Sequence, residues 1–345
     1  SLFGEVSYTL ETADMGEFEF TAGIRFYDLS DRDKSEIKGI WGSQSTCDPT
    51  DPDNDPETCA RPDLDPGIFF VNRPDQGGDE TGNRKKFSGS WRPDSNSSMY
   101  ALYAEGYRPG GNNIATLPSA CRRDDNAKYY QPRYESDSID NYELGYKASL
   151  MDNRMKIATA VYQIDWTGVQ AEIEMGCGFS FFANAAEARS RGFEIETTTA
   201  LTDDLTLTLN AGYVGAEMLT DVESIGAKAG DDMTQVPKFN VYMALDQGFN
   251  IFDRQAYGRL EIEAYDEYKS HFAGGDEDII PAYERVNLSG RIELQDGINL
   301  SLHVNNLFDE EIINWRSTTG NSYGNYHFVE YAQGRNVTMR LNFTF

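Results

Sequence analysis

The sequence is poor in the features that mark most other classes of protein. Its 345 residues contain no apolar run near the roughly 18 residues that a membrane-spanning helix needs. Only 4 Cys and 3 His are present, without the spacing of a zinc site. Bases number 30 against 57 acids, and the net charge of -27 excludes nucleic acid as an expected partner, because phosphate binding needs a basic surface.

Catalytic patterns are also missing, so no catalytic residue and no enzymatic activity are predicted. Neither Gly-x-Ser-x-Gly nor His-Glu-x-x-His occurs, and the three histidines lie far apart in the sequence. The carboxylate pairs Glu194/Glu196 and Glu261/Glu263 have the spacing of a hydrolase pair in principle. A polar wall of a sheet explains them without catalysis, because residues two apart on a strand share a face.

The end of the chain has a strict alternation of side chains. From residue 336 to residue 345, polar and apolar side chains alternate, which predicts a strand with one apolar and one hydrated face. The apolar face includes Phe343 and the terminal Phe345. The last residues of a soluble domain usually fray, whereas an aromatic girdle at a bilayer surface would accommodate them. We therefore take these two phenylalanines as a signature of a barrel C-terminus.

Similar segments recur along the whole chain, and helical periodicity is nearly absent. Their hydrated faces contain whole charges and amides, which is typical of a water-filled interior rather than a packed core. The sequence thus predicts an all-β, transmembrane antiparallel up-and-down barrel of the outer-membrane type. About thirteen strands are expected, at 2–10, 16–28, 85–93, 98–107, 140–150, 154–172, 189–200, 204–218, 237–247, 256–268, 283–294, 298–308 and 335–345.

The connections between these segments alternate between short and long. Tight turns on one side and long loops on the other are the layout of outer-membrane barrels. Single-chain bacterial barrels have an even number of strands, so we expect either strands before Ser1 or one that the pattern misses. The long loops are expected outside the cell, near 29–84, 108–139, 173–188, 219–236, 269–282 and 309–334.

Several motifs, in order, resemble TonB-dependent outer-membrane receptors. They are Tyr103–Asn112 running into a Gly-rich loop, Tyr142–Lys147, Ser190–Glu196, Asn306–Asp309, and Gly334-Arg335 before the last strand. The resemblance implies that residues 1–345 are the C-terminal portion of a barrel of about 22 strands. The plug domain and TonB box of the family are not in this sequence.

The resemblance also implies a function at the outer membrane of a Gram-negative bacterium. Uptake of a ferric siderophore, energised by the TonB complex, is the expected activity, with carbohydrate, cobalamin or an aromatic compound as alternative ligands. A non-transporting surface anchor or adhesin is a second hypothesis, and a secreted soluble β-protein is a third. Expected partners are the small-molecule ligand, membrane lipid and lipopolysaccharide; a lipoprotein partner is left open.

Cysteines and acidic residues stand out in the loops. Disulfides persist in the oxidising exterior, so we expect Cys47 to pair with Cys59 and Cys121 to pair with Cys177. No cofactor is required. Calcium is one hypothesis for the acidic loop, since carboxylates are its usual ligands, at Asp51, Asp53, Asp55 and Glu57. Pro56 and Pro62 occupy positions where an EF-hand needs Gly and Glu, so a solvated acidic loop is the alternative.

Two loops carry candidate ligand contacts. Arginine and aromatic side chains suit a ring-bearing or chelate ligand, through stacking and hydrogen bonds. For any single one of them, packing between loops or contact with an aromatic girdle is the favoured explanation; only as a group do they indicate ligand contact. The predicted contacts are Arg108, Asn112 and Asn113 where a strand enters a Gly-rich loop, and Trp315, Arg316, Tyr323 and Tyr326 in the last long loop.

Overall fold

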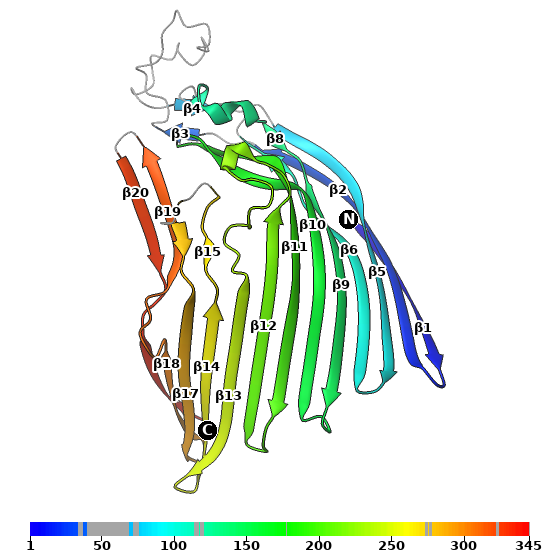
Figure 1. Cartoon of the computed structure of the whole chain (residues 1–345), viewed down its shortest axis with the longest axis vertical. Helices are drawn as coiled ribbons and strands as arrows, with labels where there is room; N and C mark the ends of the chain where they lie inside the picture. The colour runs from blue at the N-terminus through cyan, green and yellow to red at the C-terminus, as the bar shows by residue number, and fades with distance from the viewer. Residues whose placement is uncertain are drawn as a thin grey trace, which may run out of the picture.

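One antiparallel sheet contains most of the chain. A computed structural model describes residues 1–33, 37–39, 69–71, 76–113, 117, 121–176, 178–272, 275, 278–321 and 324–344. Thirteen strands pair strictly in sequence order (Figure 1). They are β1 (Leu2–Thr12), β2 (Gly16–Asp33), β5 (Gln76–Asp94), β6 (Ser97–Arg108), β9 (Asp137–Leu150), β10 (Met155–Glu174), β11 (Ser180–Ala200), β12 (Leu205–Met218), β13 (Phe239–Ile251), β14 (Arg254–Tyr265), β17 (Tyr283–Gln295), β18 (Ile298–Asn305) and β21 (Asn336–Phe343).

The remaining strands form small two-stranded pieces at the long-loop end of the sheet. Two short 3-10 helices, η3 (Asp125–Tyr129) and η4 (Glu223–Ile225), lie in loops of the same end. None of the helices among the described residues is long and apolar enough to cross a membrane. The short strands are β3 (Ile37–Gly39) with β4 (Phe69–Val71), β7 (Gly111–Asn112) with β8 (Arg133–Tyr134), β15 (Tyr268–Lys269) with β16 (Ile279–Ile280), and β19 (Ile313–Asn321) with β20 (Gly324–Tyr331).

The strand register gives the sheet one apolar and one polar face, as the alternation predicted. Between β18 and β21, Leu300 faces Leu341 and Leu302 faces Met339, while His303 faces Thr338 on the other side. Met339 remains 73% exposed, like many other large apolar side chains of this face. A soluble protein would bury such a surface; hydrocarbon solvates it.

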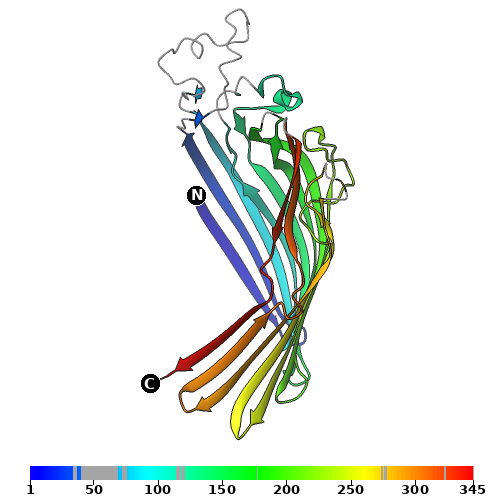
Figure 2. The same ribbon diagram turned by 90° about the vertical axis from the view of Figure 1, so that its left-hand side faces the viewer.

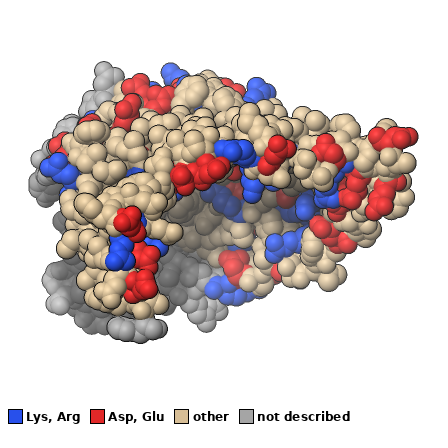
Figure 3. Space-filling model, turned by 90° about the horizontal axis from the view of Figure 1, so that it is seen from below, with Lys and Arg blue, Asp and Glu red and all other residues tan. Residues whose placement is uncertain are grey.

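The other face of the sheet is the hollow one, and it carries the charges. The sheet curves into an open trough whose edges are β1 and β21 (Figure 2). Acidic and basic side chains line its hollow when it is seen from below (Figure 3). Arg259 pairs with Asp246 and Glu261, both at 2.9 Å, and Arg285 pairs with Glu263 at 2.5 Å. On this face, networks of paired charges stand where a conventional core would have apolar side chains.

The short turns lie between the predicted strands, and loops such as 219–236 begin where expected, but other long loops are shorter than predicted. Residues 151–153 all have positive φ, between 54° and 65°, in the tight turn between β9 and β10. The predicted loop 173–188 is wrong, because β10 and β11 continue through it as a hairpin and only residues 175–179 connect them. The predicted loop 29–84 likewise loses residues 29–33 and 76–84 to β2 and β5. Residues 309–334 contain the hairpin β19–β20.

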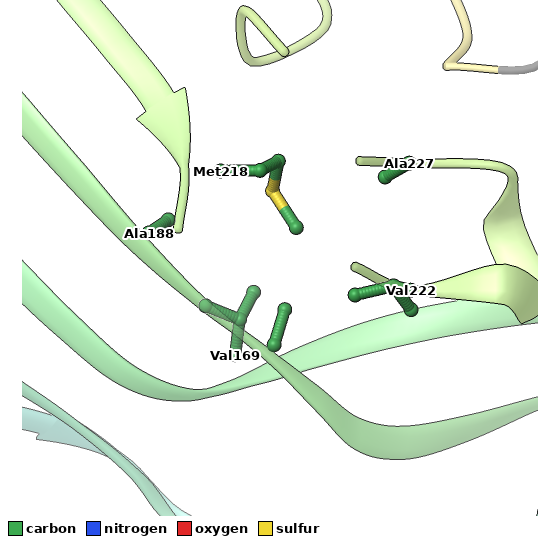
Figure 4. Close-up of a cluster of buried hydrophobic side chains, with 6 residues drawn as sticks. Val169, Ala188, Met218, Val222 and Ala227 are labelled. Atoms are coloured by element: carbon green, nitrogen blue, oxygen red, sulfur yellow. The ribbon is translucent and has the colours of Figure 1, made fainter. Parts of the chain in front are cut away.

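Two small apolar cores hold the long-loop end together. In one, Val169, Ala188 and Met218 meet Val222 and Ala227 of the loop around η4 (Figure 4). In the other, Ile173, Met175 and Phe181 pack around Cys121 and Leu117. Strand and loop side chains therefore pack together at this end, which fixes the position of the site described below.

Candidate ligand site at the long-loop end of the sheet

An arginine, an aspartate and a tryptophan from three adjacent strands form the centre of the candidate site. Arg108 ends β6 and lies opposite Asp137, the first residue of β9. The Arg108 guanidinium donates to Asp137 Oδ2 through Nε at 2.7 Å, and its main-chain N–H donates to Oδ1 at 2.8 Å. Trp166 Nε1 of β10 donates to the same Oδ2 at 2.9 Å. The Arg108 guanidinium also lies 4.6 Å from the centre of the Trp166 ring.

The strand register explains why these three side chains meet. Trp166 lies opposite Ile139, and Ile139 is two residues from Asp137, so all three side chains point to the hollow face. The Asp137 side chain is only 1% exposed, whereas that of Arg108 is 50% exposed. Three hydrogen bonds converge on the buried Asp137 side chain. It therefore fixes the guanidinium in place while part of the cation stays open to solvent.

A cavity of about 420 Å³ opens beside this group. Its walls are mostly apolar and come from β9, β10, β11, β12 and the loop after η4. A concave, largely apolar surface with a few fixed polar groups is the usual form of a small-molecule site. The lining residues besides Arg108, Asp137 and Trp166 are Tyr107, Ile139, Ile164, Ala188, Arg189, Ser190, Val214, Ala216, Met233 and Val236.

The two predicted asparagines hold the neighbouring segment in place. Asn113 is buried, and its amide exchanges hydrogen bonds with the Phe182 main chain at 2.7 and 2.9 Å and donates to Gln131 O at 2.8 Å. Asn112 donates to Asp31 of β2, which also pairs with Arg133 of β8 at 2.8 Å. Of the predicted group, Arg108 is therefore the residue that lines the cavity.

Charges and hydrogen bonds also lower the pKa of two carboxyl groups at this end of the sheet. Burial by itself would raise the pKa of Asp31, but the Arg133 charge and hydrogen bonds from Arg133, Asn112 and the Gly78 main chain hold it below its ordinary value. In the loops, hydrogen bonds from Tyr129 and Lys128 lower the pKa of Glu223, and so connect η3 to η4. Both carboxylates therefore act as anchors of the loop structure at neutral pH.

The second predicted group lies in a different network. Trp315 meets His271 edge-on, with ring centres 6.1 Å apart, and Arg316 donates to the Ile279 main-chain oxygen at 3.2 Å. These contacts join β19 to the β15–β16 hairpin. No contact within the described part of the chain joins this network to Arg108. Tyr323 and the Tyr326 side chain lie outside the described residues.

Several other predicted sites are also outside the described residues. They are the calcium ligands Asp51, Asp53, Asp55 and Glu57, the cysteines Cys47, Cys59 and Cys177, and the terminal Phe345. Cys121 is described, fully buried and engaged in a disulfide. Among the described residues, no group of three or more potential metal-ligating side chains occurs. The calcium site and both cysteine pairings therefore stay predictions.

Sequence reasoning missed Asp137 and Trp166. Each lies in a strand segment whose alternation is weak, because near the loops both faces carry polar groups. A signal was nonetheless present: Trp166 is a large aromatic among the polar residues Asp165 and Thr167. Only the register, which sets Asp137 opposite Arg108, shows that they form one site.

Comparison with known proteins agrees with the fold. The family model described as TonB-dependent receptor-like, beta-barrel, matches residues 1–307. The chain belongs to the TonB-dependent receptor family. This is a family of transporters and receptors rather than of enzymes, and its barrels place the chain in the outer membrane of a Gram-negative bacterium.

Curated relatives match only part of their own length. The chain is 30% identical over 207 residues to the metal-pseudopaline receptor CntO of Pseudomonas aeruginosa, and covers 27% of it. It is 30% identical over 208 residues to the ferrichrome outer membrane transporter/phage receptor of Escherichia coli, and covers 26% of it. The match to the probable TonB-dependent siderophore receptor PiuA of Acinetobacter baumannii is 21% identical over 273 residues, 33% of that protein. The chain thus spans about a third or less of these relatives.

Solved structures of the family share the fold. The ferric yersiniabactin uptake receptor FyuA of Yersinia pestis superposes with a TM-score of 0.71 at 16% identity, covering 99% of this chain and 45% of that one. The ferric-catecholate receptor Fiu of E. coli, in its closed form, gives 0.67 at 15% identity, with 98% and 44% covered. At such low identity the likeness concerns the barrel and not the ligand.

Proposed function

We propose that this chain is part of an outer-membrane receptor that takes up a metal chelate, with a ferric siderophore as its ligand and TonB as its energy source. Family membership supports the transporter class. The curated relatives named above are receptors for metal-pseudopaline, ferrichrome and siderophore. The part of the barrel that is present would supply the ligand-contacting wall.

The observation that carries this proposal is the Arg108 group beside its cavity. Ferric siderophores combine apolar or aromatic groups with oxygen-rich, often anionic, chelating groups. The apolar wall from Ile164 to Val214 would contact the former, and the open part of the Arg108 guanidinium would donate to the latter. The net charge of -27 would repel an anionic chelate, which makes a fixed local cation necessary.

The proposal is tested in the organism that carries the gene. A deletion strain should lose growth on at least one of a panel of ferric siderophores under iron limitation, and the wild-type gene should restore it. A strain with Arg108→Ala should restore growth weakly, because a charge-assisted hydrogen bond contributes about 1.5–3 kcal/mol, roughly tenfold or more in affinity. Arg154→Ala, at the short-turn end, is the matched control and should restore growth fully.

Growth that is unaffected by deletion with every ferric siderophore would contradict the proposed ligand class. Uptake of cobalamin or a carbohydrate by the same strains would indicate the alternative ligands. A deletion that abolishes surface adhesion, with no uptake defect, would instead favour an anchor or adhesin. Energisation is tested in a strain without TonB, which should show the same loss of growth as the deletion.

A further inference from the structure

A second cavity lies on the hollow face of the sheet, at its short-turn end. It has a volume of about 610 Å³ and is lined by β5, β6, β9, β10, β11 and β12. In an outer-membrane barrel the short turns face the periplasm, so this cavity lies on the periplasmic side. Its lining is rich in hydroxyl and amide side chains, which include those of Ser98, Ser149, Thr198, Thr208 and Asn210.

Two lysines of this cavity have no carboxylate partner. Lys147 faces Ala158 across β9 and β10, and Lys156 faces Ser149 two positions nearer the turn. The two lysines are therefore diagonal neighbours, with backbone positions about 7–8 Å apart. Lys147 lies 5.6 Å from the centre of the Tyr100 ring, and neither ammonium forms an ion pair within the described part of the chain. Like charges at this distance repel, and an anion bound between them would offset the repulsion.

The other charged side chains of the cavity do not neutralise these lysines. Asp94 accepts hydrogen bonds from the main chain and a side chain of its own turn. Arg92 is already paired with two glutamates of β2. Glu196 of β11 faces Ala158 and pairs with neither lysine. Lys147 and its neighbour are thus the open cations among the described residues that line the cavity.

This cavity and the one at the long-loop end lie on the same wall of the barrel. β10, β11 and β12 line both of them. Along β10, Ile164 of the first cavity and Ala158 of the second are about 20 Å apart, at the usual rise of a strand. The cross-strand rows between them are Ala160–Glu194–Gly212 and Tyr162–Gly192, so Glu194 is their only charge. An anion on this wall is repelled at the middle and attracted at both ends.

We propose that the cavity around Lys147 and Lys156 is a second binding site for the anionic ferric chelate, occupied on its way to the periplasm. The two ammonium groups bind charged oxygens of the chelate, and the surrounding hydroxyls donate to its remaining oxygens. Glu194 keeps the anion at one end of the wall or the other. The inference rests on the proposed function, because it takes the same ligand, but this site acts in release rather than in capture.

The experiment separates capture from transport in cells that make the full-length receptor. The probe is the radioactive-iron complex of the siderophore that the deletion strain fails to use. Its binding to cells without TonB gives the surface Kd, and its uptake by cells with TonB gives the transport rate. We expect Lys147→Gln/Lys156→Gln to keep the surface Kd, whereas the maximal uptake rate falls about tenfold. Lys147→Arg/Lys156→Arg, which keeps both charges, should restore most of the rate.

Two further variants serve as controls. Arg291 faces Tyr257 on the hollow face of β17, forms no ion pair within the described residues and lies outside the cavity. Arg291→Gln removes such a cation from the opposite wall and should leave uptake unchanged. Arg108→Ala should show the reverse pattern of the lysine variant, with a weaker surface Kd. Each variant is scored only if it reaches the outer membrane as a heat-modifiable barrel.

Other outcomes would overturn the proposal. Normal uptake by the double glutamine variant would remove the second site, and an equal loss in Arg291→Gln would show that any hollow-face cation has the same effect. A weaker surface Kd in the lysine variant would assign the lysines to capture. Raised sensitivity to a glycopeptide antibiotic too large for an intact outer membrane would show that the lysines hold a plug domain in the barrel. If wild-type cells neither bind nor take up any ferric siderophore, the proposed function itself has failed.

Discussion

At the scale of single residues, Asp137 controls the candidate ligand site. Its buried carboxylate accepts hydrogen bonds from the Arg108 side chain, the Arg108 main chain and Trp166. Trp166 donates to Asp137 and also lies against the Arg108 guanidinium, so it helps to hold both groups in place. The position of the cation thus depends on two side chains that do not need to touch the ligand.

Replacing Trp166 by Phe should separate positioning from folding. The ring remains, but Asp137 Oδ2 loses a donor, which costs about 1–3 kcal/mol for a buried polar group. We expect weaker binding of the ferric chelate, measured by fluorescence or calorimetric titration, with a folded barrel. The matched change Trp91→Phe removes a donor to Met15 O at the short-turn end and should leave affinity unaltered. Equal affinities in both variants would show that Trp166 does not position Arg108.

At the scale of elements, the segment around β7 and β8 is attached to β2 by charges rather than by apolar packing. Asp31 accepts from Asn112 and pairs with Arg133, and its lowered pKa records that these contacts favour its anion. Asp31 lies beyond Phe26, the last residue of the outward apolar run of β2. Its ionisation therefore responds to the pH of the outside medium.

Acid should release this segment. Because the folded pKa of Asp31 is depressed, its contribution is complete above the ordinary carboxyl pKa and disappears as the pH falls through the folded value. Hydrogen exchange of residues 111–113 and 133–134, corrected for the intrinsic exchange rate at each pH, should rise between pH 5 and pH 2, in the range of carboxyl titration. Asp31→Asn should exchange faster at neutral pH and lose this pH dependence. A wild-type profile without such a rise would contradict the anchoring role.

A disulfide is a second link within the long-loop end of the sheet. Cys121 is buried with Ile173, Met175 and Phe181, at the hairpin that joins β10 to β11. Because Cys177 lies two residues from Met175 in sequence, we predict that it is the partner of Cys121, and that Cys47 pairs with Cys59. Peptide mapping without reductant should recover both linkages. A Cys121 peptide crosslinked to Cys47 or Cys59 would refute both pairings.

At the scale of the whole molecule, stability depends on which face of the sheet meets hydrocarbon. Leu302 and His303 are neighbours in β18, but Leu302 is 46% exposed on the apolar face and His303 points into the polar hollow. In a soluble protein, the effect of a charged substitution at either position would depend only on how exposed that position is. In a membrane, Leu302 contacts hydrocarbon and His303 contacts water. The two positions are therefore a matched pair for testing which face meets lipid.

Leu302→Arg should therefore destabilise the barrel by about 2–4 kcal/mol if the position is near the bilayer midplane, whereas His303→Arg should have little effect. The folded fraction in outer membranes, read from heat-modifiable migration, measures the difference. Similar yields for the two variants would show that the apolar face does not contact lipid. The same logic predicts impaired insertion for a charged substitution of Phe345.

The sequence by itself determined the architecture, because the period-2 pattern of segments such as 204–218 and 283–294 is set by backbone geometry and by the two solvents on either side of the sheet. The number of sheet strands followed from this pattern, whereas the family came from motifs that resemble TonB-dependent receptors. Above the hydrocarbon both faces are wet, so alternation vanishes, and the continuation of β10 and β11 through 173–188 could not be predicted. Tertiary structure alone decided that Asp137, Trp166 and Arg108 meet, since register depends on pairing between strands far apart in sequence.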